Sequence, residues 1–160
     1  LVHEKLYQSA TLSSISLADY VSDLCLHLGT SSATEARGIH LSHHVAAITV
    51  SMETAVPLGL LINELVVNSL KHAFPAERPG HIRVSIAQDA PGRCVLEVSD
   101  DGVGQSSGPI GVKSLGTKLI SALAGQINGQ VQTLSPQEGS GCTTRVTFVL
   151  SGGGGERVGG

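Results

Sequence analysis

The feature that most constrains the fold is the order in which helical and strand patterns follow one another between residues 57 and 150. A helical stretch comes first, then two strands, then a second helical stretch and two more strands. Each pair of strands is joined by a turn, so the paired strands are expected to be antiparallel. This order predicts an α+β fold, a two-layer α/β sandwich, and disfavours an alternating βαβ fold.

Proline, glycine and hydrophobic periodicity set the expected boundaries. The first helix is predicted from Pro57 to Phe74, because Pro57 suits a first turn and Pro75 cannot continue a helix. The other predicted elements are strands over 81–88, 94–99, 130–134 and 143–150, an Ala-Pro-Gly turn between the first two, and a helix over 115–128 that Gly129 ends.

The segments outside this region have weaker patterns. Residues 1–29 are predicted to be helical with an interruption near 11–14, and Ser14 or Ser16 is the expected cap of the second part. Residues 30–38 are a polar linker, and residues 39–51 alternate as a strand or a hairpin would. The glycine-rich tail, 151–160, is expected to be disordered, because it has too few apolar side chains to offset the entropy of ordering.

Composition excludes several classes of function. Apolar residues make up 41% of the chain and charged residues 14%, which allows one buried core and argues against general disorder. A net charge of −3, with ten scattered Lys and Arg, argues against a nucleic-acid or anionic-membrane surface. The only aromatic side chains besides histidine are Tyr7, Tyr20, Phe74 and Phe148, so no platform for stacking bases is expected.

Cysteine usage and hydropathy indicate the compartment. Cys25, Cys94 and Cys142 are odd in number and far apart, which fits neither a disulfide framework nor a zinc site and favours the reducing cytoplasm. We expect them to be buried as small apolar residues. No apolar run approaches the roughly 20 residues that a membrane helix needs. Because the sequence begins at Leu1, we expect it to be a fragment of a longer protein.

The first chemical motif is NELVVNSLKHAF, residues 63–74. Its spacing places Glu64, Asn68, Lys71 and His72 on one helical face, opposite an apolar stripe. Magnesium prefers hard oxygen donors such as the Asn68 amide oxygen, and Lys71 would meet a phosphate as a point charge. A solvated helix face with a charge pair is the alternative for this motif taken alone.

The second motif is VSDDGVG, residues 98–104, in which a strand ends in two aspartates and a DxGxG loop. Asp100 is placed to accept a hydrogen bond from an exocyclic amine such as that of adenine. Gly102 and Gly104 let the backbone approach a ligand closely. The alternatives are an acidic turn or a calcium loop, and the spaced oxygen ligands of an EF-hand are missing.

Two further motifs are weaker on their own. SLGTKLI, residues 114–120, puts Leu115 and Gly116 at a helix start, where backbone N–H groups favour an anion. GSGCTTRVTF, residues 139–148, is a glycine turn before a strand that contains Thr144. Neither a Walker sequence nor GxGxxG at the start of a helix occurs, which disfavours P-loop and Rossmann nucleotide sites.

In this order the four motifs resemble the Bergerat-type ATPase fold of histidine kinases, gyrase-type topoisomerases, mismatch-repair ATPases and ninety-kilodalton heat-shock chaperones. NELVVNSLKHAF resembles the histidine-kinase N box, and VSDDGVG and SLGTKLI resemble its two glycine boxes. The resemblance implies Mg²⁺ and ATP as cofactors, Asn68 as magnesium ligand, Glu64 as the catalytic acid/base group and Asp100 on the adenine amine. It also implies nucleotide contacts by Lys71, His72, Gly102, Gly104, Leu115, Gly116 and Thr144.

A narrower resemblance involves the first helix. Residues 1–24, with PLGLLINELVVNSLKHAF, resemble the histidine kinases that form a sister group to the HWE type. This implies a partial dimerisation segment over 1–29, a linker over 30–38 and an ATP-binding catalytic domain over 39–150. It also implies phosphoryl transfer to an upstream histidine and on to a response regulator, in a homodimeric parent.

Three departures from the pattern leave alternatives open. The phosphoacceptor run His-Arg-x-Lys-Asn-Asn is absent, the stretch between Gly104 and Ser114 is a short lid, and SLG replaces the more usual GxG. A non-catalytic phosphotransfer or docking module with the same fold, or an anti-sigma-type serine kinase, is the alternative function. His40, His43 and His44 form the one tempting metal cluster, but strand alternation turns His43 away from the other two.

Overall fold

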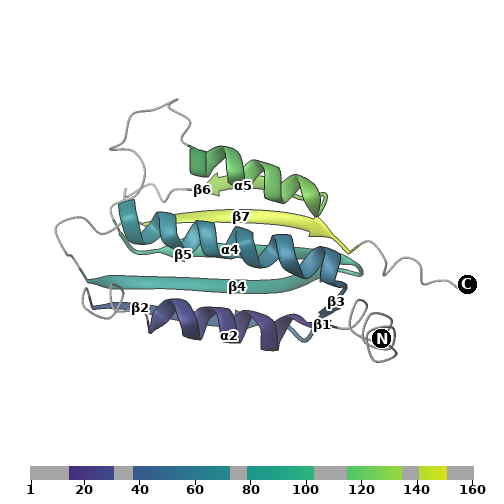
Figure 1. The fold of residues 1–160 in the computed structure, drawn as a ribbon, viewed down its shortest axis with the longest axis horizontal. Helices are drawn as coiled ribbons and strands as arrows, with labels where there is room; N and C mark the ends of the chain where they lie inside the picture. Colours follow the sequence, from purple (N-terminus) through teal and green to yellow (C-terminus); the bar gives the residue numbers. More distant parts are fainter. Residues whose placement is uncertain (1–14, 31–37, 73–78, 103–114, 135–140, 151–160) are drawn as a thin grey trace, which may run out of the picture.

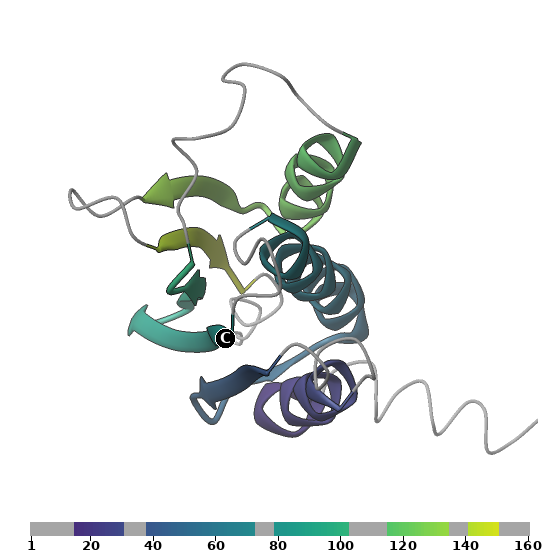
Figure 2. The same ribbon diagram turned by 90° about the vertical axis from the view of Figure 1, so that its left-hand side faces the viewer.

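The computed structural model describes residues 15–30, 38–72, 79–102, 115–134 and 141–150. They form two layers, a five-stranded sheet with three helices packed on one of its faces (Figures 1 and 2). The strand order is β2-β4-β5-β7-β6, with β2 parallel to β4 and all other pairs antiparallel. The strands are β2 (Ile39–Val45), β4 (Gly80–Ala90), β5 (Arg93–Asp100), β6 (Gln130–Leu134) and β7 (Cys142–Val149). The predicted two-layer α+β fold is confirmed.

The three helices lie side by side across the sheet (Figure 2). Helix α2 (Leu17–Gly29) covers β2, α4 (Met52–His72) lies in the middle, and α5 (Leu115–Gln126) lies on the side of β6. A small second sheet pairs β1 (Ile15–Ser16) with β3 (Thr49–Val50) just before α4 begins. The helices therefore leave the other face of the large sheet open.

Strand alternation explains the two faces of the sheet. Over most of β4, β5 and β7 every second side chain is buried and apolar, including Ile82, Leu96 and Phe148. The side chains between them are mostly polar or exposed and lie on the open face. This core is almost entirely aliphatic, and Phe148 is the one buried aromatic side chain among the described residues.

Helix α2 belongs to the same core as the sheet. Leu17, Val21 and Cys25 are buried in the core that also contains the sheet residues, and the Ser16 hydroxyl caps the helix by accepting from the Asp19 N–H at 3.3 Å. Residues 15–29 and the rest of the described chain therefore form one packed unit. The assignment of residues 1–29 to a dimerisation segment stays a prediction, and residues 1–14 lie outside the described part.

A glycine lets α2 approach α4 closely. An added Cβ at Gly59 would overlap the Tyr20 hydroxyl, so the aromatic side chain lies directly on the helix backbone. Burial raises the pKa of Tyr20, as expected for a phenol packed in this way. Gly59 is thus a contact point between helices, although a glycine there costs α4 about 1 kcal/mol of helix propensity relative to alanine.

The predicted start of the first helix is wrong, and so is the hairpin alternative for the segment before it. The helix begins at Met52, so Pro57 lies in its second turn, and the Ser51 carbonyl accepts the first helical bonds from Thr54 and Ala55. A proline this close to the start removes one hydrogen bond, and burial of the side chains around it keeps the turn on the core. Over 39–51 the hairpin alternative is also wrong, because β2 and β3 join different sheets.

The end of the second helix also differs from the prediction. Helix α5 stops at Gln126, and the left-handed residue after it is Asn128, with φ 55°, in place of the predicted glycine. Gly129 instead passes close to β7, where an added Cβ would lie 3.1 Å from the Val146 side chain. Close packing, and not backbone conformation, explains the glycine at this position.

All three cysteines are buried and reduced, which confirms the predicted apolar role. Burial raises the pKa of Cys25 to about 11 and also raises that of Cys94. Both thiols therefore remain protonated at neutral pH and are poor nucleophiles.

Candidate functional site

The predicted site residues come from elements that end or begin at the same end of the molecule. Helix α4 and strand β5 end there, and helix α5 and strand β7 begin there, at the left-hand end of Figure 1. The motifs that carry these residues are as much as 70 positions apart in the sequence, counting from residue 72 to residue 142. The fold therefore brings the ends of four separate motifs to one region.

The polar face of α4 lies where the sequence predicts it. Leu58, Ile62 and Val66 are fully buried against the core, whereas Glu64 and Asn68, one turn apart, are half-buried. Lys71 is exposed in the last turn, and His72 is the last residue of the helix. The folded chain therefore places the side-chain oxygen atoms of Glu64 and Asn68 on one face of α4, and the Lys71 ammonium follows in the last turn.

Two hydrogen bonds from residues that the structure describes orient Asp100. It is the last residue of β5 and shares the helix-facing side of the strand with Val98, two residues earlier. The Ser69 hydroxyl of α4 donates to its Oδ2 at 3.0 Å, and the Gly102 N–H donates to its Oδ1 at 3.0 Å. The carboxylate is therefore held between the helix and its own turn.

The neighbouring Asp101 has a different role. The His81 N–H donates to Asp101 Oδ1 at 2.8 Å, and the Asp101 N–H donates to the His81 carbonyl at 3.2 Å. Asp101 thereby extends the pairing of β4 with β5 past the end of the strand. Of the two aspartates in the motif, Asp101 fastens the turn to β4 and Asp100 faces α4.

Gly141 closes the third side of this turn. Its N–H donates to the Gly102 carbonyl at 2.7 Å, and its φ of +83° lies in the left-handed region. An added Cβ would come within 2.6 Å of the Asp100 carbonyl oxygen. The start of β7 therefore lies directly against the turn at Asp100–Gly102, and only glycine fits there.

We expect Gly141→Ala to lower the free energy of unfolding by about 2–4 kcal/mol, from left-handed strain plus a clash with a backbone atom that cannot swing away. Gly92→Ala is the matched control, because Gly92 has a similar φ of +76° but nothing within 4 Å of an added Cβ. It should cost only about 1 kcal/mol. Urea unfolding measures both free energies, and equal losses of stability would show that the close approach to the Asp100 carbonyl adds no cost beyond backbone strain.

The remaining predicted residues fall into two groups. Thr144 of β7 is half-buried and pairs with Val98, so it lies on the same side of the sheet as Asp100. Leu115 and Gly116 are the first two residues of α5. Gly104 and the predicted lid lie outside the described residues, as does the turn before residue 141.

Sequence reasoning missed three residues of this arrangement, namely Ser69, Asp101 and Gly141. Ser69 lies on the helix stripe that the periodicity assigns to the core, and it is half-buried there. A hydroxyl on such a stripe requires a hydrogen-bond partner, which is the signal that points to it. Gly141 follows a Gly-Ser pair that reads as an ordinary hairpin turn.

The donor set fits the magnesium-nucleotide site that the motifs imply. Asn68 offers a hard amide oxygen on the helix face that it shares with Glu64, and magnesium uses few protein groups together with phosphates and water. Asp100 is an acceptor of fixed orientation, as recognition of an amine requires. The described residues contain no group of three or more His, Cys, Asp or Glu side chains that could hold a metal by themselves.

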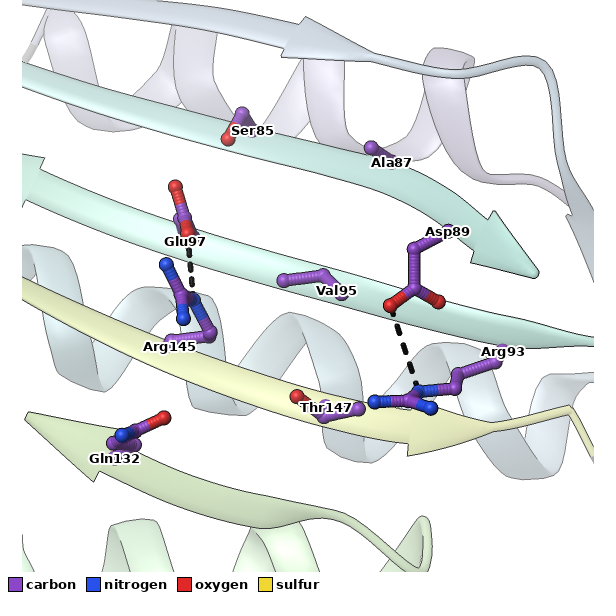
Figure 3. Close-up of a pocket in the computed structure, with 9 residues that line it drawn as sticks. All are labelled: Ser85, Ala87, Asp89, Arg93, Val95, Glu97, Gln132, Arg145 and Thr147. Carbon is purple, nitrogen blue, oxygen red and sulfur yellow. Dashed lines mark hydrogen bonds and ion pairs between the residues drawn. The ribbon is translucent and has the colours of Figure 1, made fainter.

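A hollow on the open face of the sheet is separate from this region. Figure 3 shows its lining residues, which come from β4, β5, β6 and β7 and include two ion pairs, Glu97–Arg145 at 2.7 Å and Asp89–Arg93 at 3.5 Å. Both pairs are partly exposed and contribute little to stability. None of the predicted site residues lines the hollow.

The three histidines of β2 are exposed on this edge strand of the sheet. The ring of His40 stacks on that of His81, with 5.5 Å between ring centroids. His43 pairs with Val84, whose side chain faces the helices, so it points away from His40 as predicted.

In the described ranges, no helix combines the length and apolar character that crossing a membrane requires.

Comparison with protein families identifies the fold's relatives. Residues 53–152 match the family described as "Histidine kinase-, DNA gyrase B-, and HSP90-like ATPase". The chain belongs to this family. The match covers nearly all of α4, both hairpins and α5, and therefore the four chemical motifs between residues 63 and 148. A comparison with curated proteins finds no match.

Solved structures show the same fold at low sequence identity. The histidine kinase domain of a blue-light activated histidine kinase from Erythrobacter litoralis EL346 has a TM-score of 0.66 at 22% identity, over 79% of this chain and 65% of that one. Acinetobacter baumannii histidine kinase AdeS gives 0.69 at 14%, over 87% and 67%. Full-length ShkA in complex with AMPPNP gives 0.67 at 17%, over 88% and 32%. The chain thus spans only part of the kinases that it resembles.

Proposed function

We propose that this chain is the ATP-binding catalytic domain of a two-component sensor histidine kinase. It would transfer the γ-phosphoryl group of ATP to a histidine on a dimerisation helix, from which a response regulator receives it. The observation that carries the proposal is the orientation of Asp100 between Ser69 and Gly102, at the end of the helix that carries Glu64 and Asn68. Family membership and a neighbour solved with AMPPNP, an ATP analogue, support it.

Each residue would have a separate role. Asp100 would accept from the adenine amine, Lys71 would pair with phosphate oxygens, and Glu64 would take the proton of the attacking imidazole or orient its nitrogen. Asn68 would hold Mg²⁺ through its amide oxygen, and the ion supplies charge neutralisation at the phosphates when bound. Phosphoryl transfer needs little more than such positioning and charge stabilisation from the protein.

The finer assignments rest on the sequence motifs. The resemblance of residues 1–24 and of the α4 segment favours the HWE-related class of histidine kinases. A homodimeric parent and a response-regulator receiver domain as partner follow from that class. The reduced, buried cysteines are compatible with a cytoplasmic domain.

The decisive experiment measures nucleotide binding with and without magnesium. Asn68→Ala is expected to weaken binding of Mg-ATP by about tenfold or more, from loss of a ligand to a cation, and to leave binding of metal-free ATP within about twofold. Titration calorimetry in magnesium and in EDTA gives both affinities. Asn63→Ala is the control, because Asn63 lies on α4 five residues away and so on a different face.

Two results would contradict the proposal at different levels. Equal losses of ATP affinity in Asn68→Ala, with and without magnesium, would show that Asn68 is not the metal ligand. A wild-type chain that binds no ATP in either condition would remove the ATP-binding function itself.

A further inference from the structure

We infer that Ser69 is a positioning residue that sets the purine selectivity of the site by fixing the plane of the Asp100 carboxylate. The inference rests on the proposed function, because it concerns how that site distinguishes one base from another. Ser69 itself is not assigned any contact with nucleotide. It acts through Asp100, to which its hydroxyl donates at 3.0 Å.

The direction of the hydrogen bond follows from chemistry. An ionised carboxylate is only an acceptor, so the Ser69 O–H must be the donor. The two oxygens of Asp100 are held from different elements, Oδ2 by the side chain of α4 and Oδ1 by the N–H of Gly102 in its own turn. Because the second donor is two residues from Asp100, it moves with the turn. Among the described contacts, the Ser69 hydroxyl is the donor that ties the carboxylate to α4.

Two bonds to one carboxylate restrict its rotation. The torsion of an aspartate carboxyl group is broad, so a carboxylate held by one bond explores many orientations. With both oxygens held, the plane of the group is defined and its remaining lone pairs point in fixed directions. Gly141, packed on the Asp100 carbonyl, limits movement of the backbone beneath it. The result is a rigid acceptor.

A rigid acceptor discriminates between an amine and a keto oxygen. An amine at the base edge donates to it, whereas a keto oxygen in the same place meets a second acceptor and leaves both without a proton between them. A carboxylate that can rotate turns away from the keto oxygen, so binding of the keto purine loses little free energy. Removing the Ser69 hydroxyl should therefore reduce selectivity against keto purines more than it reduces affinity for ATP.

The test compares ATP with inosine triphosphate, whose base carries a keto oxygen where adenine carries its amine. For Ser69→Ala we expect the ratio of ATP affinity to inosine triphosphate affinity to fall about tenfold, the size of one hydrogen bond to a charged group, with ATP affinity itself falling about threefold. Competition against a fluorescent ATP analogue measures both nucleotides on each variant. Thermal unfolding is recorded in parallel.

Further variants separate positioning from packing. Ser69→Thr and Ser69→Val have the same shape and differ in the hydroxyl, so the threonine variant should keep the wild-type ratio and the valine variant should lose it. Ser99→Ala is the matched control, since Ser99 precedes Asp100 on the other side of β5. In an Asp100→Asn background, Ser69→Ala should change the ratio by less than about twofold, because the two residues act as a unit.

The outcomes distinguish the inference from the function on which it rests. A wild-type ratio retained by both Ser69→Ala and Ser69→Val overturns the inference, whatever happens to their unfolding temperatures, and leaves ATP binding intact. Equal ratios for Ser69→Thr and Ser69→Val also overturn it. A wild-type chain that shows no preference for ATP removes Asp100 from base recognition, and the role of Ser69 falls with it.

Discussion

Glu64→Gln is expected to lower histidine phosphorylation in the parent kinase by about 10²–10⁴, the contribution typical of a general acid–base group. Glutamine keeps the size and polarity of the side chain but cannot take a proton from the attacking imidazole. ATP affinity should stay within about threefold. Glu64 lies on the same helix face as Asn68, but the contacts with the nucleotide are assigned to other residues. Single-turnover transfer of label from γ-labelled ATP measures the rate, and calorimetry measures the affinity.

Glu53→Gln provides the matched control for this experiment. Glu53 is exposed in the first turn of the same helix, so its loss should cost only about 0.3–1 kcal/mol of helix stability and leave the transfer rate unchanged. If Glu64→Gln phosphorylates at the wild-type rate, Glu64 has no catalytic role. If both variants lose activity in parallel, the cause is the stability of α4 and not proton transfer.

Asp100→Asn is expected to abolish the preference for ATP over GTP. A site built around a hydrogen bond to one substrate group can reject a base without it by as much as about 10⁴–10⁵, and we expect at least about a hundredfold preference in the wild type. Asparagine presents an acceptor and a donor, so either base finds a partner and the preference should fall to within about tenfold. Competition binding with the two nucleotides measures the ratio.

The local structure should tolerate this change. In the Asp100→Asn variant the new amide oxygen can still accept from the Gly102 N–H, and the Ser69 hydroxyl can turn to accept from the amide nitrogen. Asp101→Asn is the control, because Asp101 accepts from the His81 N–H and an amide oxygen replaces that acceptor. Loss of base preference in the Asp101 variant, or its retention in the Asp100 variant, would contradict the assignment.

Much of the fold could be predicted from the sequence because its elements are strongly periodic. Alternation along β4, β5 and β7 and the apolar stripe of α4 follow directly from which side chains the core buries. Boundaries were less predictable, because tertiary packing keeps Pro57 inside α4 and places Asn128 where a glycine is usual. The parallel pairing of β2 with β4 leaves no local signal, since it depends on a crossover through α4.

The candidate site was predictable to the extent that it consists of motifs. Spacing alone places Glu64 and Asn68 on one face and Asp100 at the end of a strand. The contacts that orient Asp100 come from residues 31 positions earlier and 41 positions later, at Ser69 and Gly141. No local pattern reports a hydrogen bond across such separations, so the sequence alone indicates only a packing role for Ser69 and a turn role for Gly141.

The turn at Asp100–Gly102 is bonded to α4, to β4 and to the start of β7, through Ser69, His81 and Gly141. Each of these contacts closes a long loop of chain. The entropic cost of closing such loops is offset only when the surrounding elements have packed together. The acceptor for a base thus acquires its orientation after both hairpins and the central helix are in place. An immature or locally opened chain has the full set of motifs but no defined acceptor, so ligand binding reports on completion of the fold itself.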